Sequence, residues 1–139
     1  MQNTTERLLV ALLLSLLGLV AGVHKLLGDF PPAWFEGKFS ESLIGMVPGG
    51  IALSFGIIVL LELAIPALFC AAIVKREHQQ EGLGRFAGLS FNIALILFIV
   101  LFFGSFLVQD YDNGFQDFLY FVRVVILRWR WGSSLPNAT

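Results

Sequence analysis

The chain has 139 residues, of which 57% are hydrophobic and only 14% charged, and its formal net charge is −1. Soluble domains carry about 25% charged residues, so this composition indicates an integral membrane protein and argues against general nucleic-acid binding. The single cysteine, Cys70, excludes an internal disulfide and a CxxC redox pair.

The first apolar segment covers residues 7–27. About 20 apolar residues suffice to cross a hydrocarbon core of about 30 Å. A signal peptide is the competing interpretation for a segment near the N-terminus. The first seven residues, MQNTTER, carry one acid and one base, and no A-x-A cleavage site follows, which favours a retained span.

The connection after this span, residues 28–48, mixes aromatic and charged residues. Its Pro-Pro pair is expected to stop the preceding helix. Trp34, Phe35 and Phe39 follow among charges, which predicts a short amphipathic helix at the membrane interface. An ordinary loop with scattered aromatic residues is the alternative.

Two long apolar segments, residues 49–75 and 85–109, are predicted to be the second and third spans. Pro66 lies within the second, which favours a tilt or a kink there. The residues between the two spans, 76–84, are expected to form a polar turn.

The fourth segment, residues 115–131, follows a predicted acidic turn over residues 110–114. Its apolar run is short and Arg123 interrupts it, so it either crosses with help from partner helices or lies at the surface. The charge pattern favours a crossing. The expected fold is therefore an all-α membrane protein, a four-transmembrane-helix bundle forming one domain over residues 1–139.

The distribution of Lys and Arg predicts the orientation. Basic residues gather near the N-terminus, in the turn between the second and third spans, and at the C-terminal end, whereas the acidic turn has none. Because cytoplasmic connections are enriched in Lys and Arg, we expect N-in/C-in topology, with bacterial inner membrane as the location.

Charges inside a membrane are rare and mark a function or a polar network. Glu62 lies near the middle of the second span, and Arg123 lies at a similar depth in the fourth. An estimate at about 1.5 Å per residue leaves a gap that the arginine side chain can bridge. The sequence therefore predicts a Glu62–Arg123 ion pair between the second and fourth helices.

Three further polar residues are candidates. Lys25, at the outer end of the first span, is expected to reach the interface with its long side chain. His24 either faces Glu62 as a proton-responsive pair or makes an ordinary interfacial hydrogen bond. Asn92 is expected to bond to a neighbouring helix.

Small residues at four-residue spacing predict close helix contacts. Gly18 and Gly22 form a GxxxG motif in the first span, and Ala52 and Gly56 repeat the spacing in the second.

The order of these features resembles that of the DoxX-like family of small membrane proteins. The chain has a first helix ending "GLVAGVHKL", the aromatic pair Trp34-Phe35, a central Glu62 and then the basic Arg76. The resemblance implies a four-helix bundle and, as in some members, association with quinol oxidase or other membrane redox complexes. It implies no catalytic set and no haem or metal ligands.

The leading functional prediction is a non-catalytic integral membrane subunit or assembly factor of a larger complex, for example a respiratory, quinol-oxidising one. The alternative is a small proton-linked transporter or carrier that uses Glu62 at mid-membrane. An enzyme acting on a quinone or lipid, with Trp34, Phe35 and Phe39 in an aromatic binding lip, is the third hypothesis. The sequence requires no cofactor or metal and assigns no catalytic residue, although quinone or lipid contact is compatible with it. The expected partners are membrane lipid and either other membrane proteins or further copies of the chain.

Overall fold

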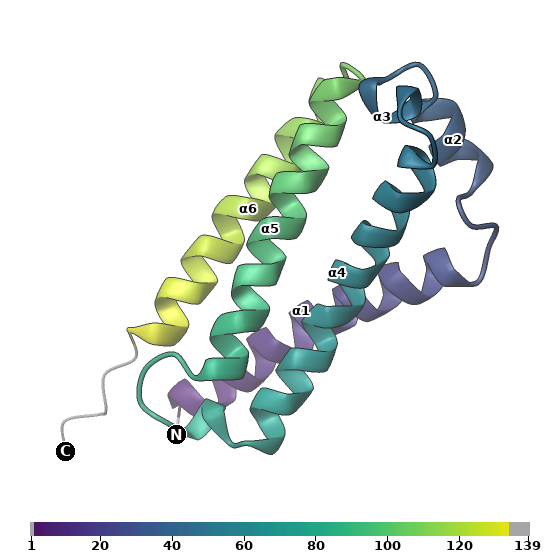
Figure 1. Cartoon of the computed structure of the whole chain (residues 1–139). Coiled ribbons are helices and arrows are strands. Elements are labelled where there is room, and N and C mark those ends of the chain that lie inside the picture. Colours follow the sequence, from purple (N-terminus) through teal and green to yellow (C-terminus); the bar gives the residue numbers. More distant parts are fainter. Residues whose placement is uncertain (1, 134–139) are drawn as a thin grey trace.

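The computed structural model describes residues 2–133, and all regular structure in this part of the chain is helical. Long helices form a bundle, and short ones connect them (Figure 1). The long helices are α1 (Gln2–Leu26), α4 (Gly50–Val74), α5 (Arg85–Leu107) and α6 (Tyr111–Gly132). The short helices are α2 (Ala33–Phe39), α3 (Leu43–Met46) and the 3-10 helix η1 (Glu77–Gln79).

Three of the long helices are long and apolar enough to cross a membrane. The candidate spans are Thr4–Leu26, Gly50–Val74 and Arg85–Leu107, and they match three of the four predicted spans. Much of their apolar surface is exposed, as lipid-facing helices require. Within the described residues this confirms an all-α fold with helices long and apolar enough to span a membrane. Among the helices of residues 2–133, α6 is too polar to count as a candidate span.

The four long helices pack in the order α1, α4, α5 and α6. Helix α4 lies between α1 and α5, and α6 packs along the outer side of α5 (Figure 1). Helix α1 diverges from α5 and α6 toward its C-terminal end, so the bundle is narrow at one end and open at the other.

We call the narrow end the base; there α1 and α5 begin, α6 ends and η1 lies. The rings of Phe69, Phe91 and Trp131 form a buried aromatic cluster, with centroids of Phe91 and Trp131 5.6 Å apart. The buried guanidinium of Arg7 donates to the carbonyl oxygen of Trp131 at 2.7 Å and also to that of Gln80. Arg7 therefore ties α1 to both the C-terminal end of α6 and the segment after η1.

The open end is covered by α2 and α3. Phe35 and Phe39 of α2 are buried, and the ring of Phe35 meets that of Phe55 on α4 at 5.0 Å between centroids. The aromatic residues that follow the Pro-Pro pair therefore form a packed helix rather than a loop. A second short helix, α3, completes the connection.

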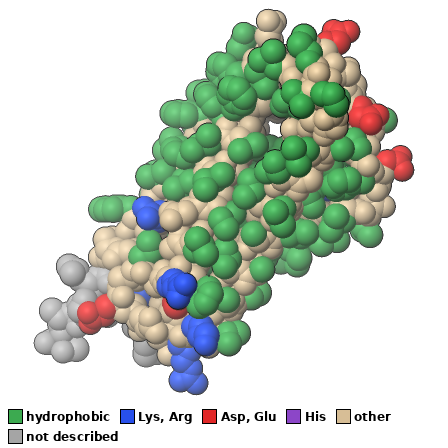
Figure 2. Space-filling model, in the orientation of Figure 1, with side chains coloured by type: hydrophobic (Ala, Val, Ile, Leu, Met, Phe, Trp, Pro, Cys, Tyr) green, Lys and Arg blue, Asp and Glu red, His purple; other side chains and the backbone are tan. Residues whose placement is uncertain are grey.

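Charged side chains are distributed unevenly over the surface (Figure 2). Apolar side chains cover most of the visible face, and Lys and Arg gather toward the base. Asp and Glu stand out at the end that carries α2 and α3, and acidic side chains are also visible near the base. Between α4 and α5, just below α2 and α3, the surface is hollowed.

Two expected turns are shorter or more structured than predicted. The prediction of an acidic turn over residues 110–114 is wrong, because α6 begins at Tyr111. Asp110 is the N-cap of α6, and its side chain accepts from the backbone N–H of Asn113. A capping carboxylate satisfies a free N–H of the first turn and so starts the helix early.

The polar turn over residues 76–84 is also more than a solvated connection, because Glu77 is buried. The Glu77 carboxylate accepts from the backbone N–H groups of Phe86 and Ala87 at 2.9 and 2.8 Å. Both N–H groups lie in the first turn of α5, where backbone N–H groups have no carbonyl acceptor within their own helix. Glu77 therefore caps α5 from nine or ten residues upstream.

Replacing Glu77 with alanine is expected to lower the free energy of unfolding by about 2 kcal/mol, because it removes two charge-assisted hydrogen bonds to the first turn of α5. Glu81→Ala is the matched control, since Glu81 is exposed in the same connection. Denaturant unfolding in mixed micelles measures both. Equal stability of the two variants would show that the cap contributes nothing.

Candidate functional site

The crossing of α1 and α4 brings the polar residues of the site together. A Cβ added at Gly18 would lie 2.5 Å from the carbonyl oxygen of Glu62 and 3.0 Å from Cδ of Pro66. Gly22 lies against the side chain of Leu63. The predicted GxxxG contact is thus confirmed, and its partner surface is the middle of α4.

The second small-residue pair, Ala52 and Gly56, makes no such contact. Ala52 is exposed, and the side chain nearest to Gly56 is the ring of Phe30 rather than another long helix.

Pro66 helps to make the close crossing possible. Proline has no N–H, so the carbonyl oxygen of Glu62, four residues earlier, lacks its ordinary helical donor. That oxygen is the atom against which Gly18 lies. Helix α4 continues from Gly50 to Val74 across the proline.

Seven residues beyond Gly18 on α1, which is about two turns, Lys25 reaches Glu62. Its Nζ lies 2.6 Å from Oε1 of Glu62, with 22% of the lysine side chain and 6% of the glutamate side chain exposed. Lys25 was expected to extend to the interface, and this prediction is wrong. A buried carboxylate in an apolar bundle needs a compensating charge, and Lys25 supplies it.

The predicted Glu62–Arg123 pair is also wrong. Arg123 is exposed on α6, and its guanidinium lies over the ring of Tyr120 at 5.4 Å from the centroid. Helix α6 packs against α5 rather than α4, so similar depth along the two helices does not bring their side chains together.

The remaining polar candidates lie apart from Glu62. His24 is exposed and lines a separate surface pocket of about 710 Å³ together with Lys25 and Asp29. Asn92 is exposed on α5, and the side-chain hydrogen bonds of residues 4–133 include none from it, so the predicted interhelical bond is not found.

Glu62 lies at the meeting point of two cavities. The larger, about 510 Å³, lies among α2, α4, α5 and the start of α6, and Lys25 also lines it. The smaller, about 200 Å³, lies among α1, α4, α5 and α6, and Leu101 is shared by both. Together they form the Glu62 cleft, whose larger part corresponds to the hollow in Figure 2.

Aromatic rings dominate the outer wall of the cleft. All three predicted lip residues, Trp34, Phe35 and Phe39, line the larger cavity, together with Phe55 of α4. Phe35 and Phe39 are buried, whereas Trp34 is 60% exposed at the edge. The structure therefore brings the aromatic segment and Glu62 to one cavity. Trp34 and Glu62 are 28 residues apart in the sequence, so the sequence does not reveal that they share a cavity.

The orientation of the Glu62 carboxylate leaves one oxygen unused. Oε1 accepts from Lys25, while Oε2 is fully buried and has no hydrogen-bond partner within the described part of the chain. An unsatisfied buried acceptor is costly and is uncommon in native proteins.

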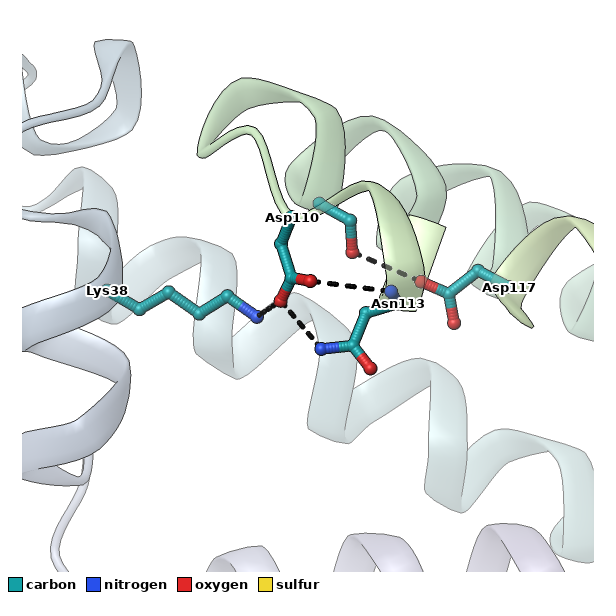
Figure 3. A network of polar contacts seen from close by, with 5 residues as sticks. Lys38, Asp110, Asn113 and Asp117 are labelled. Atoms are coloured by element: carbon teal, nitrogen blue, oxygen red, sulfur yellow. Dashed lines mark hydrogen bonds and ion pairs between the residues drawn. The ribbon is translucent and has the colours of Figure 1, made fainter. Parts of the chain in front are cut away.

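A polar network holds the rim of the cleft (Figure 3). Lys38 of α2 donates to Asp110 at 2.8 Å, and the side-chain amide of Asn113 donates to the same carboxylate at 2.6 Å. Nearby, the Ser105 hydroxyl donates to Asp117 at 3.2 Å. The Lys38–Asp110 contact therefore ties α2 to the start of α6 across the mouth of the cleft.

Hydrogen bonds from Lys38 and Asn113 lower the pKa of Asp110 from its ordinary 3.8 to about 2. The folded state thus favours the charged carboxylate. The resulting stabilisation is fully present above the unfolded pKa and is lost as the pH falls through the folded value.

Lys38→Met is expected to raise the pKa of Asp110 toward 3.8, because the lysine hydrogen bond is the largest cause of its depression. Carbon-13 NMR titration of the carboxyl group measures the change. Lys75→Met at the base is the control and should leave this pKa at about 2. An unchanged value in Lys38→Met would mean that the contact does not form in solution.

Comparison with protein families, curated proteins and solved structures finds no match to this chain, so the resemblance to the DoxX-like family stays a prediction.

Proposed function

We propose that this protein is a non-catalytic integral membrane subunit or assembly factor of a larger membrane complex, in which α6 lies against a partner. The observation that carries the proposal is the environment of α6. This helix packs against α5 alone along most of its length and exposes Arg123 near its middle.

An arginine exposed to lipid at the centre of a membrane helix costs about 3 kcal/mol on insertion scales. The ring of Tyr120 offers partial compensation. A partner helix with an acidic or amide side chain would compensate more fully. In this proposal α6 is the fourth span, and the complex is respiratory if the DoxX-like resemblance extends to function.

The test is purification from mild detergent followed by native mass spectrometry. We expect a stable partner with the unaltered chain and its loss in Arg123→Leu. Val122→Leu, an exposed apolar neighbour on α6, is the matched control and should retain the partner. Recovery of the unaltered chain alone would contradict the proposal.

The proposed setting is the bacterial inner membrane with the base on the cytoplasmic side. The gathering of Lys and Arg toward the base supports this orientation. In a Cys70→Ala background, a membrane-impermeant thiol reagent added from outside is expected to label Asp112→Cys and not Gln79→Cys. Both positions are exposed, and they lie at opposite ends of the bundle. Labelling of Gln79→Cys from outside would overturn the orientation.

A proton-linked carrier is the second candidate, and the Lys25–Glu62 pair in a cleft is what favours it. Coupled transport needs an ionisable group near mid-membrane. Proton flux into proteoliposomes that disappears in Glu62→Gln and persists in Arg123→Leu would support this candidate over the first.

A further inference from the structure

We propose that the Glu62 cleft is a binding site for an uncharged amphiphile that places a hydroxyl group between Glu62 and Lys25. This inference concerns the isolated chain and holds with or without a partner for α6.

The floor of the cleft holds a buried hydrogen-bond acceptor that lacks a donor in the described part of the chain. Oε2 of Glu62 is buried without a partner among residues 4–133, and Glu62 lines both cavities. Because Oε2 is fully buried, a ligand O–H meets this oxygen when the carboxylate turns toward the cavity, and the bond then satisfies it. The bond would be charge-assisted, which is the stronger class of hydrogen bond.

The same floor offers a donor in return. A lysine ammonium has three N–H groups, and the ion pair with Glu62 uses one of them. Lys25 also lines the larger cavity. A hydroxyl group both donates and accepts, so it suits Glu62 and Lys25 together, whereas an ether can only accept.

The charge balance selects an uncharged headgroup. Lys25 and Glu62 neutralise each other at 2.6 Å. A carboxylate or ammonium headgroup would add an unbalanced charge to an apolar surrounding, which is strongly unfavourable. A neutral hydroxyl group adds none.

The walls and size of the cleft select an apolar body. The rings of Phe35, Phe39 and Phe55 line the larger cavity, and its volume of about 510 Å³ falls within the range of small-molecule sites, roughly 300–1,000 Å³. The smaller cavity extends the apolar space past Glu62 between α1 and α6. A single-chain or ring-bearing lipid alcohol fits this description, and a folded protein domain does not.

The experiment compares two probes that differ only in the headgroup. A terminally brominated fatty alcohol and its methyl ether are titrated into nanodiscs that hold the chain, and bromine quenching of tryptophan is recorded. Trp34 lines the cavity, Trp129 is exposed on α6, and Trp131 is buried at the base. A Trp129→Phe background therefore leaves Trp34 as the tryptophan that a ligand in the cleft can quench, with Trp131 at the base as a constant background.

We expect saturable quenching by the alcohol, at a half-saturating mole fraction about tenfold lower than for the ether, because only the alcohol donates a charge-assisted hydrogen bond. Glu62→Gln should weaken alcohol binding by about the same factor, since it makes that bond neutral. Ser54→Phe, which places a ring in the larger cavity, should abolish saturable quenching.

Leu53→Phe is the matched control, because Leu53 is the exposed neighbour of Ser54 and does not line the cavity. Equal quenching by alcohol and ether would mean that lipid chains or water fill the cleft, and it would overturn the proposal. Equal behaviour of Ser54→Phe and Leu53→Phe would do the same. Both comparisons hold even if Glu62→Gln does not fold.

Discussion

Replacing Lys25 with methionine is expected to lower the free energy of unfolding by about 3 kcal/mol. The variant leaves the Glu62 carboxylate buried, with only 6% of its side chain exposed, and without its cation. Removing one member of a buried ion pair typically costs about 3–5 kcal/mol for this reason. Unfolding by a denaturing detergent, followed by circular dichroism, measures the loss.

The reverse substitution, Glu62→Gln, should cost less, about 1 kcal/mol. Lys25 is 22% exposed, and its long side chain can turn outward once its partner is lost. Glu62 has no such exit from the middle of α4. Arg123→Met is the control and should not lower stability, because the Arg123 side chain is exposed and touches the ring of Tyr120 rather than Glu62.

An equal loss in Lys25→Met and Glu62→Gln would contradict this asymmetry and would indicate that both charges are equally confined. A large loss of stability in Arg123→Met would show that Arg123 stabilises the bundle.

Alanine at Gly18 is expected to destabilise the protein by about 2 kcal/mol. The new Cβ would meet the carbonyl oxygen of Glu62 at 2.5 Å, and a backbone atom in a continuous helix cannot move aside. Overpacking of this kind typically costs about 1–3 kcal/mol. Separation of α1 from α4 would also draw Lys25 away from Glu62.

Gly22→Ala and Gly56→Ala form a graded control series. At Gly22 the obstructing atoms are Cδ2 and Cγ of Leu63, at 2.6 and 2.8 Å; they belong to a side chain that can turn rather than to the backbone, so we expect a smaller loss than at Gly18. At Gly56 the nearest side-chain atom is 3.6 Å away, and the gain in helix propensity, about 1 kcal/mol, should stabilise the protein. Equal effects at Gly18 and Gly22 would show that α1 does not cross α4 where the structure places it.

The helical class and most helix bounds could be predicted from sequence. Apolar length fixes a span, so the predicted 49–75 and 85–109 agree closely with Gly50–Val74 and Arg85–Leu107. The fourth helix begins earlier than predicted because Asp110 caps it, and capping depends on one side chain rather than on hydropathy.

The polar contacts at the base were not predictable in the same way. Arg7 counted only as a charge near the N-terminus, and Glu77 counted only as part of a polar turn. Each is buried and bonded to backbone groups of other elements. No local pattern marks such residues, because their partners are backbone atoms that any sequence supplies.

The sequence by itself determined that this protein is helical, that it enters a membrane and that Glu62 needs a compensating group, since these properties follow from apolar length and from the cost of a buried charge. Only the tertiary structure decided which group compensates. Gly18 lets α1 cross α4 closely enough to bring Lys25 to Glu62, while α6 lies beyond α5 with Arg123 exposed. Depth along a helix can be counted from sequence, but the neighbour that each helix face meets is set by the packing of the whole bundle.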